Sequence, residues 1–218
     1  MKNKRGSAPP SSLNVLFVGN SFTARNDLPG LVAKIAAADG RSLTHRLISA
    51  GGASLRQHWN KGEATKAIET GGYDYVVLQE QSTLPAKNAE RMAENVRLFD
   101  ACIRAAGSQT ALYMTWARQH AAQTQDVITA AYEDVGSELG ATVIPVGRVW
   151  QTFCQTHEQP GRYDRDGSHP SLAGSYLAAC VMYGVLFARS VAALQVDVAG
   201  LAEADRAVIQ TAATSVVK

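Results

Sequence analysis

Three side chains in two distant segments have the types needed for nucleophilic catalysis. Ser21 lies near the start of the chain, and Asp166 and His169 lie near its end. A serine hydroxyl becomes a strong nucleophile only when a base takes its proton, and the base needs a third group that fixes its tautomer. A carboxylate three residues before an imidazole can reach its Nδ1 atom and leave Nε2 facing outward. The three residues are therefore candidates for nucleophile, base and orienting acid.

The same residues also have structural interpretations. Serine is favoured at turns and helix starts, because its hydroxyl bonds nearby backbone groups. Asp166 precedes Gly167, and this pair is typical of a turn in which the carboxylate accepts from the backbone. The position of Ser21 after an apolar run, paired with a second polar segment before a helix, favours the catalytic interpretation. Asp166 can serve both roles.

Five short apolar runs predict the strands that must position these residues. Nearly continuous runs are typical of parallel strands covered on both faces, and apolar residues spaced by three and four indicate one face of a helix. The predicted strands are residues 13–18, 43–50, 75–78, 110–114 and 142–146, and helical patterns cover 28–35, 92–106, 128–139 and 172–187. Right-handed crossovers then place helices on both faces. The fold class is α/β, a three-layer α/β/α sandwich with a five-stranded parallel sheet.

Length and composition indicate one globular domain. A chain of 218 residues can fill one core but is short for two domains, and its 46% hydrophobic and 18% charged residues are ordinary for a globular protein. We expect a flexible leader over residues 1–12 and a single domain over 13–218. The Ala-rich segment 201–217 fits a surface helix or a self-association face, so the oligomeric state stays open.

Charge, cysteines and histidines argue against several other classes. The net charge of +2 gives no field that would indicate a nucleic acid partner, and three distant cysteines form neither a disulfide framework nor a C-x-x-C motif. His45, His58, His120 and His157 share no metal-ligand spacing, so we expect no metal and no cofactor. No apolar run is long enough for a membrane span. We expect a soluble protein that is cytoplasmic as the sequence stands, with a secreted or periplasmic location open if a signal peptide was removed.

Small and polar residues follow each predicted strand. The first strand is followed by Gly-Asn-Ser at 19–21, the second by Gly-Gly at 51–52, the third by Gln-Glu-Gln-Ser at 79–82 and the fourth by Thr-Trp-Ala-Arg at 115–118. In open α/β sheets, ligands bind beyond the carboxyl ends of the strands. The sequence therefore predicts a site at this edge.

Two of the motifs resemble those of the GDSL or SGNH hydrolases. Gly-Asn-Ser-Phe at 19–22 and Asp-x-x-His-Pro at 166–170 occur in that family's order and span nearly the whole expected domain. The resemblance implies a flavodoxin-like fold with Ser21, His169 and Asp166 as a triad. It also implies attack by Ser21 on an ester carbonyl, an acyl-enzyme intermediate, and hydrolysis by water activated through His169.

The groups that would bind the oxyanion depart in part from the family pattern. The resemblance implies a backbone N–H from a glycine after the second strand, which matches Gly52 or its neighbour Gly51. It also implies an asparagine amide after the third strand, where this sequence has no asparagine. Counting from the strand end places Gln81 there, with Gln79 as the alternative and Asn20 as a further candidate beside the nucleophile.

Trp116 and Arg118 follow the fourth strand and have two interpretations each. Core packing is the default for a tryptophan, and the alternative is that Trp116 lines the substrate pocket and stacks on a sugar ring. Arg118 could meet an anionic or polar substrate or a surface carboxylate, and the surface carboxylate is favoured.

The expected function is that of a serine ester hydrolase with a small-molecule ester as its partner. Small acyl groups are expected, and acetyl esters of carbohydrates are favoured because the resemblance includes many such deacetylases. A lipid esterase, an arylesterase or a thioesterase would use the same residues. The alternatives are an acyltransferase and a catalytically impaired carbohydrate-binding protein on the same scaffold.

Overall fold

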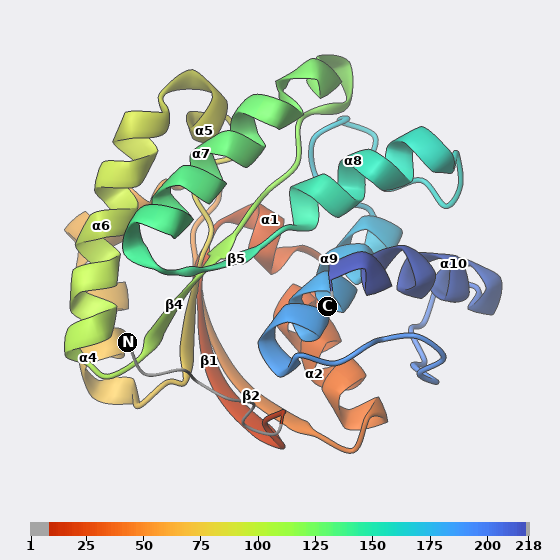
Figure 1. The fold of residues 1–218 in the computed structure, drawn as a ribbon, viewed down its shortest axis with the longest axis horizontal. Coiled ribbons are helices and arrows are strands. Elements are labelled where there is room, and N and C mark those ends of the chain that lie inside the picture. Colours follow the sequence, from red (N-terminus) through yellow and green to blue (C-terminus); the bar gives the residue numbers. More distant parts are fainter. Residues whose placement is uncertain (1–8, 217–218) are drawn as a thin grey trace.

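A computed structural model describes residues 9–216, and a five-stranded sheet lies at its centre (Figure 1). The strands are β1 (Ser12–Gly19), β2 (Ser42–Ser49), β3 (Tyr75–Leu78), β4 (Gln109–Tyr113) and β5 (Thr142–Ile144). They pair in the order β2-β1-β3-β4-β5, and every neighbouring pair is parallel. This order is that of flavodoxin-like sheets. The predicted α/β class and five-stranded parallel sheet are confirmed.

Helices cover both faces of the sheet (Figure 1). One face carries α3 (Leu55–Lys61), α4 (Glu63–Gly71), α6 (Ala89–Ala105) and α7 (Gln125–Leu139), and the other carries α2 (Leu28–Ala38), α8 (Val146–Thr156), α9 (Leu172–Phe187) and α10 (Glu203–Ala213). Side chains of β1 alternate between the two layers: Val15 and Phe17 pack with α2 and α9, whereas Leu16 and Val18 pack with α6. This alternation is the pleat of a strand buried on both faces.

Shorter elements lie mostly in the connections. These are α1 (Ser21–Ala24), α5 (Leu84–Lys87) and the 3-10 helices η1 (Arg25–Asp27), η2 (Gln119–Thr124) and η3 (Thr214–Val216). Four of them, α1, η1, α5 and η2, follow the carboxyl ends of β1, β3 or β4. They therefore form part of the edge where the sequence predicts a site.

The helix α9 is buried on all sides. Fourteen of its sixteen residues are buried, and it packs against α2, α8 and α10. Ser171 caps its first turn by accepting from the backbone N–H of Gly174 at 3.1 Å. Because α9 begins directly after the Asp166–His169 segment, a rigid core element fixes one end of that segment.

The structure differs from the sequence-based expectations in several places. Three of the longer helices, α3, α4 and α8, were not predicted, nor were the four-residue helices α1 and α5, and Val146 begins α8 although it was expected to end a strand. The inner face of α4 consists of Ala64, Ala67 and Ile68, and alanines give a weak periodic signal. The predicted leader lies mostly outside the described residues, and Ser12 already belongs to β1. In the part of the chain that the structure describes, no helix is both long and apolar enough to span a membrane.

Candidate active site

Ser21 is the first residue of α1, directly beyond the carboxyl end of β1. Asn20 caps this short helix, and its Oδ1 accepts from the backbone N–H of Phe22 at 3.0 Å. The Nδ2 of the same side chain donates to the carbonyl of Ala53 at 3.0 Å. Asn20 is only 2% exposed. Its side chain therefore ties the loop that carries Ser21 to the segment after β2, and the geometry favours positioning over contact with an oxyanion.

The buried side chain of Gln79 supports the same loop. Its Oε1 accepts from the backbone N–H of Asn20 at 2.9 Å and from the Thr23 hydroxyl at 3.0 Å, and its Nε2 donates to the carbonyl of Glu80. The side chain is fully buried. A Cβ at Gly19 would lie 2.6 Å from Gln79 Oε1, so the close approach of this amide requires a glycine there. Gln79 thus holds the turn and does not present its amide to a substrate.

His58 is a buried support on the other side of Gly19. Its Nε2 lies 2.7 Å from the Gly19 carbonyl oxygen, and burial lowers the pKa of the imidazole. A neutral imidazole with its proton on Nε2 donates to that carbonyl. Of the two roles expected for this histidine, surface or packing, the structure shows packing, because the buried ring contacts the backbone that precedes the Ser21 loop.

Asp166 both closes a turn and contacts the imidazole. Its Oδ1 accepts from the backbone N–H groups of Ser168 and His169, each at 2.9 Å, and its Oδ2 lies 2.5 Å from His169 Nδ1. Gly167 has a φ of 64°, a left-handed conformation that favours glycine. The hydrogen bond with the His169 side chain, followed by the two backbone donors, holds the pKa of Asp166 well below its usual range.

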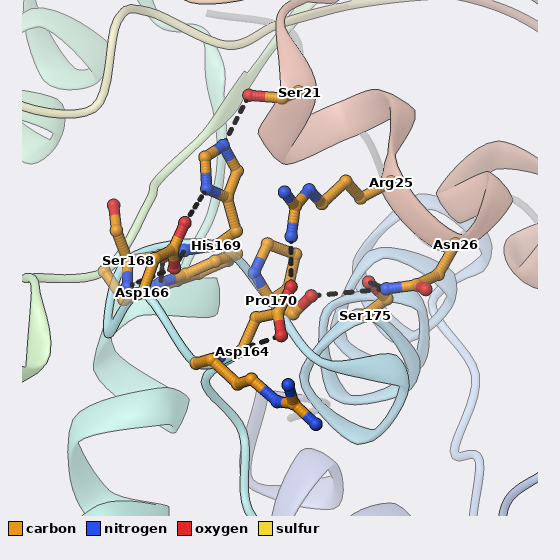
Figure 2. A network of polar contacts seen from close by, with 11 residues as sticks. Ser21, Arg25, Asn26, Asp164, Asp166, Ser168, His169, Pro170 and Ser175 are labelled. Carbon is orange, nitrogen blue, oxygen red and sulfur yellow. Dashed lines mark hydrogen bonds and ion pairs between the residues drawn. The ribbon is translucent and has the colours of Figure 1, made fainter.

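The structure brings Ser21, His169 and Asp166 together in one line of hydrogen bonds (Figure 2). Ser21 Oγ lies 2.8 Å from His169 Nε2, although the two residues are 148 positions apart in the chain. The side chain of His169 is 25% exposed and that of Asp166 is 45% exposed. The arrangement can deprotonate the serine hydroxyl, and it is open to solvent on one side.

Polar contacts join the two distant segments beside the serine (Figure 2). Arg25 forms an ion pair with Asp164. Asn26 Nδ2 donates to the hydroxyl of Ser175 at 2.9 Å and to the carbonyl of Pro170 at 3.3 Å. These residues lie directly after α1 and on either side of the Asp166–His169 turn. They fix the position of the Ser21 hydroxyl relative to the His169 imidazole.

Trp116 lies behind the site and is 1% exposed. One ring neighbour is Trp150, stacked at 3.8 Å, and another is Phe22, at 4.9 Å. Its Nε1 donates to the carbonyl of Ser168 at 3.1 Å. The suggestion that Trp116 stacks on a sugar ring is therefore corrected, because the buried ring has no face open to a ligand. It braces the loop that carries His169.

The backbone N–H groups of Ser21, Gly51 and Gly52 lie at this edge, and none of the three has an acceptor among residues 9–216. The two glycines form a turn closed by a 3.1 Å hydrogen bond from Ala53 N to the Ala50 carbonyl, and Gly52 has a φ of 66°. The turn adjoins the Ser21 loop, because Ala50 N donates to the Gly19 carbonyl at 3.3 Å. These donors are available to a developing negative charge.

Gln81 differs from Gln79 in having a free amide nitrogen. Its Oε1 accepts from the backbone N–H and hydroxyl of Thr83, each at 2.9 Å, and from Leu84 N at 3.1 Å. These contacts fix the side chain, and within the described residues its Nε2 has no acceptor. Of the two glutamines that the sequence offered, Gln81 is the one whose amide can still donate.

Glu80 is a positioning residue that the sequence analysis did not identify. Its fully buried carboxylate accepts from the backbone N–H groups of Gln81 at 2.7 Å and Leu55 at 3.0 Å, and from Asn95 Nδ2 at 2.8 Å. Arg56 in turn donates to Asn95 Oδ1 at 2.9 Å. Burial raises the pKa of Glu80 despite these donors. Because Leu55 begins α3 directly after the glycine turn, Glu80 links that turn to Gln81. The only sequence signal is an acidic residue two positions after a buried strand.

Fold and site together define a flavodoxin-like α/β protein with a serine, a histidine and an aspartate aligned at the carboxyl edge of its sheet. Within residues 9–216, no group of three or more His, Cys, Asp or Glu side chains could hold a metal ion. The sequence matches no protein-family model and no curated protein.

Solved structures do resemble this chain. A protein from Slackia heliotrinireducens that is inferred to be an SGNH hydrolase aligns with a TM-score of 0.70 at 27% identity, over 80% of this chain and 99% of that one. A DUF4886 family protein from Bacteroides uniformis aligns with a TM-score of 0.77 at 22% identity, over 94% of each chain. The acetyl xylan esterase AlAXEase aligns with a TM-score of 0.64 at 14% identity, over 79% of this chain and 98% of that one. The predicted resemblance to the GDSL/SGNH hydrolases is confirmed.

Proposed function

We propose that this protein is a serine ester hydrolase in which Ser21 is the nucleophile, His169 the general base and Asp166 the residue that orients the histidine. The observation that carries the proposal is the 2.8 Å contact between Ser21 Oγ and His169 Nε2, continued by the 2.5 Å contact from Nδ1 to Asp166. The similar solved structures include an inferred SGNH hydrolase and an acetyl xylan esterase, which supports ester chemistry.

The reaction proceeds in two halves. His169 Nε2 takes the hydroxyl proton of Ser21 as Oγ bonds to the ester carbonyl carbon, and the carbonyl oxygen becomes an oxyanion. Collapse of this intermediate breaks the bond to the alcohol, which leaves with the proton from His169. Water then attacks the acyl-enzyme with His169 again as the base, and the acid and free Ser21 are released.

The oxyanion is held by donors that lack other acceptors. We assign this role to the backbone N–H of Ser21, a backbone N–H of Gly51 or Gly52, and Nε2 of Gln81. Donors that are fixed before charge develops stabilise it without reorganisation. Contacts to Thr83 and Leu84 fix the Gln81 amide, so the side chain is suited to that role in spite of its length.

Small acyl groups, with acetyl esters of carbohydrates first among them, are the proposed substrates. The support is the likeness to an acetyl xylan esterase, a name that describes that protein. Release of acetate from acetylated xylan and from acetylated monosaccharides, measured beside p-nitrophenyl acetate and p-nitrophenyl palmitate, would separate a carbohydrate deacetylase from a general or lipid esterase.

The enzyme assignment is tested by turnover and by covalent labelling. Wild-type protein should release p-nitrophenol from p-nitrophenyl acetate and react with a fluorophosphonate probe, and Ser21→Ala should do neither. Ser168→Ala is the matched control, because this serine lies one residue from His169 but contributes only backbone contacts. Wild-type protein that equals Ser21→Ala in both assays would overturn the assignment and favour a binding protein. Transfer of the acetyl group to an added alcohol instead of water would identify an acyltransferase.

A further inference from the structure

A cavity of about 400 Å³ lies between α5 and the segment formed by η2 and α7, and cationic side chains line it. Lys87, Arg118 and His120 contribute to its walls, and no carboxylate does. The remaining lining residues are Ser82, Thr83, Ala86, Ala121, Thr124 and Ile128. The cavity thus combines an apolar surface with two permanent positive charges and an imidazole.

The cationic groups of this cavity are not engaged elsewhere in the described part of the chain. Arg25, Arg97 and Arg148 each form an ion pair with a carboxylate, whereas neither Lys87 nor Arg118 does so among residues 9–216. Both side chains are exposed. The sequence-based interpretation favoured a surface carboxylate as the partner of Arg118, but within the part of the chain that the structure describes no carboxylate forms an ion pair with it. Charges without partners remain available to an anionic ligand.

Both walls of the cavity continue directly into the proposed active site. Ser82 and Thr83 follow Gln81, and Thr83 donates twice to its Oε1. On the other wall, the backbone N–H of Gln119 donates to the carbonyl of Gly167 at 2.8 Å. Adjacent Cα atoms lie 3.8 Å apart along a chain. The lining residues Ser82 and Arg118 are therefore next in the chain to Gln81 and to Gln119, the residue bonded to the turn that carries His169.

We propose that this cavity is a subsite for a carboxylate-bearing part of the substrate, so that the enzyme prefers esters with a negatively charged substituent on a short apolar body. The inference rests on the proposed esterase function. Arg118 and Lys87 would pair with the carboxylate, and Ala86, Ala121 and Ile128 would contact the apolar body. A concave surface lined by one sign of charge also raises the local concentration of an oppositely charged substrate.

The proposal is tested with ester pairs that differ in charge. The first pair is 4-acetoxybenzoate and its methyl ester, which place the charge on the leaving group. The second pair is 4-nitrophenyl hydrogen adipate and 4-nitrophenyl hexanoate, which place it on the acyl group. For at least one pair, wild-type protein should show a higher kcat/KM for the charged ester. The pair that shows this preference assigns the cavity to the acyl or the alcohol side.

Charge-removing variants connect that preference to the cavity. The double variant Lys87→Gln with Arg118→Gln loses two partly exposed ion pairs with the substrate carboxylate. The ratio of kcat/KM for the charged ester to that for the neutral ester should therefore fall about tenfold. Lys66→Gln, which removes an exposed charge on α4 outside the cavity, is the control and should leave the ratio unchanged. Added NaCl should lower the wild-type ratio and hardly change that of the double variant.

The outcomes separate this proposal from the proposed function. If the neutral esters are hydrolysed above the Ser21→Ala background but the double variant keeps the wild-type ratio, the subsite is overturned and the esterase assignment stands. If wild-type protein hydrolyses none of the esters above that background, both proposals fail. A ratio that falls equally in Lys66→Gln would also overturn the subsite, because the effect would then be one of net charge.

Discussion

Two aspartates at opposite edges of the sheet show how similar local electrostatics can serve different ends. Asp39 follows α2 and lies at the amino edge of the strands, where it meets Arg41 at 3.0 Å, Arg189 at 3.1 Å and the hydroxyl of Tyr183. Asp166 lies at the carboxyl edge, where it meets His169. Hydrogen bonds from these partners hold the pKa of both carboxyls well below the usual range.

The difference lies in where each line of hydrogen bonds ends. At Asp39, two guanidinium groups and a buried phenol surround a carboxylate whose side chain is 12% exposed, so the cluster is closed on itself. At Asp166, the line passes through an imidazole to the hydroxyl of Ser21 and then faces solvent. A lowered carboxyl pKa therefore does not by itself mark a site. A chain of hydrogen-bonded side chains that ends at a group facing solvent, at the ligand-binding edge, is the more informative feature.

The largest effect expected from this comparison is on turnover in Asp166→Asn. The amide oxygen can still accept from the backbone of the turn, but the side chain no longer stabilises the imidazolium or fixes its tautomer. We expect kcat for p-nitrophenyl acetate to fall about ten-thousandfold, as when this role is removed in serine hydrolases. The free energy of unfolding should change by only about 1 kcal/mol, because the carboxylate is half exposed. Activity that survives within tenfold of wild type would remove Asp166 from the proposed triad.

Much of the fold could be predicted from the sequence because its signals are local. Apolar runs predicted the five strands with boundaries within two residues of those observed, and the helix over 172–187 was predicted to the residue. Its inner and outer faces are both apolar, which is typical of a fully buried helix. The helices α3 and α4 lacked such a signal, because alanine and histidine form much of their buried surface.

The candidate site was predictable where a motif names a residue and less so where contacts decide its role. Ser21, Asp166 and His169 were proposed from two short motifs, and the structure brings their side chains within hydrogen-bonding distance. Gln79 and Gln81 could not be separated from spacing alone, since their difference lies in which amide atoms already have partners. The role of Glu80 depends on Asn95 and Leu55, which are distant in sequence, so no local pattern indicates it.

Gln81 and Gln79 differ in a similar way, because within the described residues the amide nitrogen of Gln81 has no acceptor and that of Gln79 has one. Their variants give the next largest expected effect on turnover. Gln81→Ala should lower kcat for p-nitrophenyl acetate about a hundred- to a thousandfold, as expected for the loss of one oxyanion donor. It should destabilise the fold less than Gln79→Ala does, because the Thr83 and Leu84 groups that lose an acceptor are only partly buried. Gln79→Ala should instead destabilise the fold by about 2 kcal/mol, because it leaves the Asn20 N–H and the Thr23 hydroxyl buried without an acceptor. Kinetics and urea unfolding of both variants measure this. A Gln81→Ala enzyme with the wild-type rate would exclude the assigned donor.

The smallest effect is expected on the stability of the cluster around Asp39, and its dependence on pH distinguishes it from an effect on catalysis. Asp39→Asn should lower the free energy of unfolding at pH 7 by about 2 kcal/mol and leave kcat unchanged, because it weakens charged hydrogen bonds far from Ser21. Since folding lowers the pKa of Asp39, its ionised form stabilises the protein above the unfolded pKa of about 4, and this contribution is lost as the pH falls towards the folded pKa. Urea unfolding at pH 7 and pH 3 should therefore show a smaller difference between wild type and variant at pH 3. A difference that is the same at both pH values would show that the charge of Asp39 adds nothing to the packing of its neighbours.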